Sequence, residues 1–138
     1  MNTSKHGVTG MALSSEEVQA FMDYLVDAIP VKGKVHKDGR EVTDTSIRDA
    51  DVYYIEHEAE NLYEILQKVA QMVNLYFKYD LTGIEKAQIL HYKAPSNGYS
   101  YHIDLDSSEK SISRKVSVTI VLNDGYEGGE ICFRTSET

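Results

Sequence analysis

A histidine and an aspartate stand two positions apart, at His102 and Asp104, within the stretch YHIDLD. We predict a strand over residues 99–106, and strand side chains alternate between faces, so these two side chains point to the same side. An imidazole and a carboxylate on one face offer two adjacent metal ligands, two of the three that a two-histidine, one-carboxylate iron site needs. Alone, the pair is more typical of the polar outer face of a half-buried strand.

Two helices are predicted upstream of this pair. Ser14 and Glu17 have the spacing of a capping box, and apolar residues at helical spacing follow as far as Pro30. A second, broad apolar stripe predicts a helix over residues 58–79. Residues 1–12 are small and polar without any period, and we expect them to be poorly ordered.

Strands are predicted for most of the remaining chain. Alternating or β-branched runs occupy residues 52–56, 86–93, 99–106, 114–123 and 130–134. The charged segment 31–50 predicts short strands joined by a turn at Lys37-Asp38-Gly39. Helices followed by a run of strands indicate a single α+β domain over residues 1–138, with helices packed outside an antiparallel sheet or barrel.

Composition narrows the functional classes. The formal net charge of −8 argues against nucleic acid as a partner, because phosphate binding needs a basic surface. Cys132 is the single cysteine, which excludes a disulfide framework and is compatible with a cytoplasmic location. No apolar run approaches the ~18 residues of a membrane helix, so we expect no membrane partner.

Several residues around the pair complete a longer pattern. Tyr92 and Tyr99 precede it across a Pro/Asn/Gly turn, and Arg114 starts an alternating run that leads to a Gly-Gly turn. In this order and spacing, YKAPSNGYSYHID and RKVSVTIVLNDGYEGGEICF resemble the iron(II)/2-oxoglutarate-dependent dioxygenases of the prolyl 4-hydroxylase-like branch. The resemblance is closest over residues 88–133 and extends loosely upstream to SIRDADVYYI, where an Arg stands just before a strand.

The resemblance implies a fold and an activity. The fold would be a double-stranded β-helix, or jelly roll, with N-terminal supporting helices. His102 and Asp104 would hold Fe(II), and the Tyr92 hydroxyl would contact a carboxylate of the cosubstrate 2-oxoglutarate. The reaction would hydroxylate a C–H bond of a peptide or small-molecule substrate with dioxygen, and ascorbate would serve as reductant. An aromatic packed inside the barrel is an equally good interpretation of Tyr92. Residues 32–50 are either a substrate-covering loop or a solvated hairpin.

The chain departs from the family pattern in its C-terminal part. Family members take a second histidine ligand after the Gly-Gly turn, and a more distal Arg or Lys binds 2-oxoglutarate. All five histidines here, at positions 6, 36, 57, 91 and 102, lie at or before the motif. We therefore expect an incomplete jelly roll, with the distal histidine and basic residue lying beyond this sequence and little turnover by the chain alone.

Two other functions stay open. A degenerate β-helix that binds a peptide without oxidising it would not need the missing ligand. A metal-dependent hydrolase would use His102, Asp104 and Asp106 as its ligands, and it would act without 2-oxoglutarate.

Overall fold

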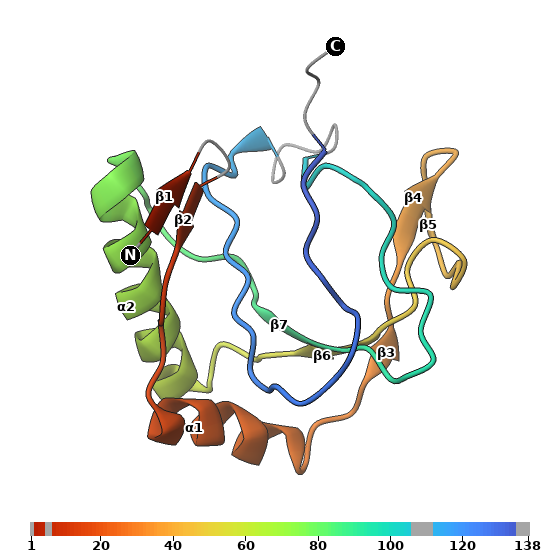
Figure 1. Ribbon diagram of the computed structural model, residues 1–138, viewed down its shortest axis with the longest axis horizontal. Helices are drawn as coiled ribbons and strands as arrows, with labels where there is room; N and C mark the ends of the chain where they lie inside the picture. Colours follow the sequence, from red (N-terminus) through yellow and green to blue (C-terminus); the bar gives the residue numbers. More distant parts are fainter. Residues whose placement is uncertain (1, 5–6, 106–111, 135–138) are drawn as a thin grey trace.

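The computed structural model of this chain describes residues 2–4, 7–105 and 112–134. Over these residues the fold is α+β, with two helices and small antiparallel sheets (Figure 1). The α+β prediction is confirmed at this level. In the described part of the chain, no helix combines the length and the apolar character that crossing a membrane requires.

Helix α1 spans Ser15–Leu25 and begins with the predicted capping box. The Ser14 hydroxyl accepts a hydrogen bond from the backbone N–H of Glu17 at 3.2 Å, and the Glu17 carboxylate accepts one from the N–H of Ser14 at 3.0 Å. Each side chain thereby satisfies a backbone donor that the first helical turn leaves unpaired. The helix ends several residues before Pro30.

Helix α2 spans Glu60–Phe77 and follows the predicted apolar stripe. It ends at Lys78, whose left-handed backbone (φ 57°) stops the helical hydrogen bonding while its N–H still bonds to the carbonyl of Asn74. The Asn74 side chain then holds the chain beyond the helix, because its oxygen accepts from the N–H of Tyr79 at 3.0 Å.

A three-stranded antiparallel sheet packs against the helices. Its order is β3 (Val31–Lys32), β6 (Asp51–Tyr54) and β7 (Gln88–His91). The two longer strands lie within or beside the runs predicted at 52–56 and 86–93. Because β6 is central, its backbone groups can pair on both sides, and its Val52 is almost fully buried.

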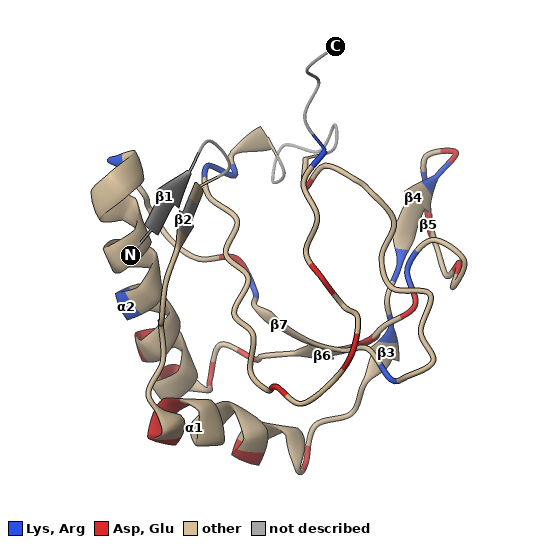
Figure 2. Cartoon of the chain, in the orientation of Figure 1, with Lys and Arg blue, Asp and Glu red and all other residues tan. Residues whose placement is uncertain are grey.

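A hairpin joins β4 (Val35–Lys37) to β5 (Arg40–Val42), as predicted. Asp38 and Gly39 form its two-residue turn with φ of 52° and 74°, the left-handed conformations that such tight turns require. Charges of both signs lie around this hairpin and β3 (Figure 2), where Lys37 contacts Asp44 at 3.1 Å. A second hairpin, β1 (Asn2–Ser4) with β2 (Gly7–Thr9), lies within the segment expected to be poorly ordered.

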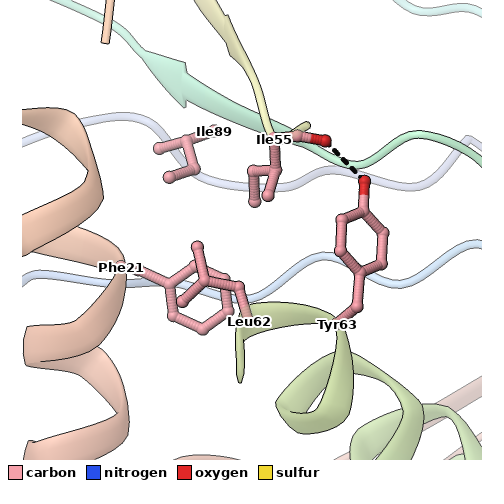
Figure 3. Packing of buried hydrophobic residues seen from close by; sticks show 5 residues of the cluster. All are labelled: Phe21, Ile55, Leu62, Tyr63 and Ile89. Carbon is pink, nitrogen blue, oxygen red and sulfur yellow. Dashed lines mark hydrogen bonds between the residues drawn. The ribbon is translucent and has the colours of Figure 1, made fainter. Parts of the chain in front are cut away.

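The core joins both helices to the sheet. Phe21 of α1 and Leu62 of α2 meet Ile55 and Ile89 in one buried cluster (Figure 3). Tyr63 closes this cluster, because its hydroxyl donates to the carbonyl of Ile55 at 2.6 Å and accepts from the N–H of Ala87 at 3.0 Å. The buried Tyr63 hydroxyl therefore both donates and accepts a hydrogen bond, and these bonds link α2 to the chain after β6 and to the chain before β7.

Three predicted strands are absent as strands within the described residues. Residues 100–105, 114–123 and 130–134 run without ladder pairing, and the one isolated β-bridge in the described residues joins Tyr99 to Arg48. The reason is that alternation favours an extended backbone, whereas a strand also needs a hydrogen-bonded neighbour. Segment 114–123 nevertheless touches the core, because Leu122 packs against the buried cluster.

An ion pair between the helices makes stability depend on pH. Hydrogen bonding to Lys68, and then the N-cap bond from Ser14, lower the pKa of Glu17 below its ordinary 4.5. A lowered folded-state pKa stabilises the fold above the unfolded-state pKa, and this contribution disappears as the pH falls through the folded value. We expect Glu17→Gln, which keeps a capping oxygen, to show a smaller loss of unfolding free energy between about pH 5 and pH 3 in urea titrations.

Glu16→Gln removes the same charge from the same helical turn without removing the pair with Lys68. It should follow the wild-type pH dependence. An unchanged pH profile for Glu17→Gln would show that the ion pair does not stabilise the fold.

Candidate functional site

The segment that carries the His–Asp pair is tied to the chain before β6. Asp49 accepts from the N–H of Asn97 through its carboxylate at 3.0 Å and donates its own N–H to the carbonyl of Gly98 at 2.7 Å. The N–H of Ser100 donates to the carbonyl of Ile47 at 2.8 Å. These bonds fix residues 97–100 against residues 47–49, immediately before the two candidate ligands.

His102 and Asp104 face one another at the end of this anchored segment. The distance from His102 Nε2 to Asp104 Oδ1 is 3.1 Å, and both side chains are partly exposed, at 37% and 53%. The other ring nitrogen, Nδ1, lies 2.7 Å from the carbonyl oxygen of Ser100. Because a carbonyl oxygen only accepts, this bond assigns a proton to Nδ1. In the neutral ring, Nε2 therefore turns its lone pair toward the carboxylate.

This arrangement fits two ligands of one metal ion. Two ligands that bind an ion at ~2.1 Å and at right angles lie ~3 Å apart, close to the separation of Nε2 and Oδ1. A lone pair and a carboxylate repel each other unless a proton or a cation lies between them. The bond from Nδ1 to Ser100 is also the usual support of a metal-binding imidazole. The geometry therefore suits either a protonated imidazole paired with the carboxylate or a divalent cation bound by both, with iron among the ions that such N and O ligands accept.

Arg114 holds the backbone at Asp104. Its guanidinium donates to the carbonyl oxygen of Asp104 and forms two bonds to the Glu85 carboxylate, at 2.6 and 2.9 Å. A forked pair of this kind fixes both position and direction. Asp104 is thereby linked to the segment that leads into β7. Sequence reasoning singled out Arg114 but missed Glu85, since nothing in a local pattern joins residues 29 positions apart.

We expect Arg114→Met to lower the affinity of the site for Co(II) by about tenfold, the smaller end of what lost support around a metal ligand costs. The cause would be a less ordered Asp104, and competition with a chelating dye measures the affinity. Lys115→Met removes the same charge one position away and should bind as wild type. Equal affinities for the two variants would show that Arg114 does not support the site.

Tyr92, the predicted cosubstrate contact, follows β7 directly and is 40% exposed. Burial raises the pKa of its hydroxyl above the ordinary value, a shift that Arg48 opposes and Tyr99 reinforces. The hydroxyl therefore keeps its proton at neutral pH and can donate a hydrogen bond.

Asp106, a ligand of the hydrolase alternative, falls outside the described residues. In the part of the chain that the structure describes, no three His, Cys, Asp or Glu side chains form a metal-binding group. An open hollow of about 360 Å³ beside the start of α2 contains none of the predicted site residues; it is lined by His57, Glu60, Tyr63, Glu64, Gln67 and Ile84.

Comparisons of the chain with protein-family models, with curated proteins and with solved structures find no match. The functional interpretation therefore depends on the geometry around His102 and on the pattern of the sequence.

Proposed function

We propose that this chain carries part of the catalytic site of an iron(II)- and 2-oxoglutarate-dependent dioxygenase of the prolyl hydroxylase-like type. In this proposal residues 88–133 belong to a double-stranded β-helix core. The observation that carries it is the 3.1 Å approach of His102 Nε2 to the Asp104 carboxylate, with Nδ1 committed to Ser100. The surrounding motif, from Tyr92 to the Gly-Gly turn, supports iron over other divalent ions.

The residues have distinct roles. His102 and Asp104 hold the iron, and Arg114 holds Asp104 through its carbonyl oxygen. When bound, iron and 2-oxoglutarate supply the oxidising chemistry that hydroxylates a C–H bond of a peptide or small molecule. The protonated Tyr92 hydroxyl donates a hydrogen bond to a carboxylate of 2-oxoglutarate. The chain itself binds, orients and supports these groups.

The third ligand comes, in this proposal, from outside these 138 residues. Two of the other described histidines lie against other side chains: His36 lies 3.7 Å from Glu41, and the ring of His57 lies 4.9 Å from that of Tyr63. The same origin is proposed for the basic residue that binds the far carboxylate of 2-oxoglutarate. The isolated chain is then expected to bind iron weakly and to turn over little or no cosubstrate.

Binding of 2-oxoglutarate tests this proposal without requiring turnover. Mixed without oxygen, the protein, Fe(II) and 2-oxoglutarate should give a visible charge-transfer band that needs all three components. We expect Tyr92→Phe to weaken 2-oxoglutarate binding by about tenfold, the effect of one hydrogen bond to a charged group. Tyr101→Phe, whose ring lies 4.0 Å from the Arg134 guanidinium, should bind as wild type. Because the isolated chain is expected to bind iron weakly, Fe(II) and 2-oxoglutarate are raised until a weak site would be saturated. A wild-type protein that gives no band at those concentrations would contradict the dioxygenase assignment.

A non-catalytic binding module is the second candidate. The observation that favours it is the exposure of large apolar side chains around the motif, with Ile103 81% and Phe133 63% exposed. If such side chains form one contiguous patch, that patch would be typical of a surface that meets another molecule. Peptide binding that is independent of iron and unchanged in His102→Ala would support the module over the enzyme.

A further inference from the structure

We infer that Tyr99 and Arg48 are positioning residues that fix the plane of the His102 imidazole. The inference rests on the proposed function in one respect only, namely that the His102 imidazole binds a metal ion. The Tyr99 and His102 rings are stacked, with centroids 3.7 Å apart and planes inclined by 16°. A ring held flat against its neighbour has lost most of its rotation about the last side-chain bond. Tyr99 thus restricts the orientation in which Nε2 can point.

Arg48 contacts the same tyrosine ring. Its guanidinium carbon lies 4.9 Å from the centroid of the Tyr99 ring, within the range of a cation–π contact. One end of the guanidinium donates to the carbonyl oxygen of Lys34 at 3.2 Å, and the other to the Gln88 side chain at 3.3 Å. Arg48 is therefore held by the chain before β4 and by β7 while it contacts the tyrosine.

The position of Arg48 requires a glycine at position 33 and leaves one buried N–H without a hydrogen bond. A Cβ atom at Gly33 would lie 2.8 Å from Arg48 Nε, so only glycine leaves room for the side chain in this position. Within the described residues, Nε is buried and makes no hydrogen bond. An unpaired buried N–H is unfavourable, and the contact with Tyr99 is an attraction that offsets it.

The stack and the hydrogen bond to Ser100 constrain the same ring in different ways. The bond to Ser100 fixes which ring edge faces the backbone, and the stack fixes the ring plane. Together they direct Nε2 toward Asp104 before any metal arrives. A ligand ordered in advance binds more tightly, because less freedom is lost on binding.

Nuclear magnetic resonance of the His102 ring tests the stack without any metal. A proton above an aromatic face is shifted upfield, so the His102 ring protons of the wild-type protein should lie upfield of those of free imidazole. Tyr99→Leu should remove this shift, and Tyr99→Phe, which keeps the ring, should retain it. Ring protons of wild-type His102 at the positions of a free imidazole would overturn the inference, whether or not any variant folds.

Metal binding provides the second readout. Co(II) affinity should fall by about tenfold in Tyr99→Leu and in Arg48→Met, and should be restored in Tyr99→Phe. Lys86→Met removes a cation from above another tyrosine ring, that of Tyr54, and should leave the affinity unchanged. If the wild-type protein binds no Co(II), the proposed iron site is wrong, and the ring-proton shifts still test the stack. If the wild-type protein and Tyr99→Leu bind Co(II) equally, the positioning role of Tyr99 is wrong, and the proposed iron site is unaffected.

Discussion

Replacing His102 by alanine is expected to lower the affinity for Co(II) or Fe(II) by at least about 100-fold, because loss of a direct ligand costs at least as much as the 10- to 100-fold of a supporting contact. The chain offers two ligands, so removing one leaves a single carboxylate that is half exposed to water. Anaerobic calorimetry, or competition with a chelating dye, measures this difference.

His36→Ala is the matched control. His36 also lies beside a carboxylate, that of Glu41, but at 3.7 Å and within the β4–β5 hairpin. Its replacement should leave metal affinity unchanged. If His36→Ala weakened binding as much as His102→Ala, the metal would be bound by scattered imidazoles and not at the proposed site.

Leu62→Ala should lower the free energy of unfolding by about 3 kcal/mol, within the range measured for buried leucines truncated to alanine. Leu62 is 1% exposed and packs among Phe21, Ile55 and Ile89, where α1, α2 and the sheet meet. Truncation leaves a cavity that three separate elements would have to close together. Urea denaturation followed by circular dichroism measures the change.

Leu75→Ala makes the same substitution in the same helix at a residue that is 76% exposed. It should change the free energy of unfolding by less than about 0.5 kcal/mol, as at other surface positions. The comparison removes the effect of helix propensity, which both variants share. Equal losses for the two variants would mean that the cluster around Leu62 is not the core of this fold.

Elements with local signals could be predicted from the sequence. The capping box at Ser14 and Glu17 set the start of α1, and the left-handed turn at Asp38-Gly39 set the β4–β5 hairpin. The apolar stripe of α2 gave that helix within a few residues of its ends. In each case the interacting residues are neighbours within four positions along the chain, so a local pattern in the sequence is enough to predict the element.

The later strands could not be predicted in this way. The alternation over residues 114–123 is a property of the segment, but pairing depends on a second segment with a free edge. In the described residues, β7 pairs with β6, and beyond β7 the backbone forms one isolated bridge, between Tyr99 and Arg48, and no ladder. The extended runs therefore lack the ladders that would make them strands.

The candidate site likewise combines a feature that the local sequence predicts with contacts that it does not predict. Spacing alone predicts that His102 and Asp104 lie on one side, and the structure brings their side chains within 3.1 Å on a bent segment. Their supports come from far along the chain: Arg114 pairs with Glu85, and Arg48 lies against Tyr99. Such contacts are set by packing of the whole domain, and no residue spacing reports them.

Paramagnetic line broadening by Mn(II) tests most directly whether His102 and Asp104 bind one metal ion together. At less than one equivalent of metal, the resonances of His102, Asp104 and their immediate neighbours should broaden first, and Asp104→Asn should abolish the effect. His36, His57 and His91 serve as internal references in the same spectrum. Broadening that begins at those histidines or at surface carboxylates, with His102 unaffected, would contradict the iron site.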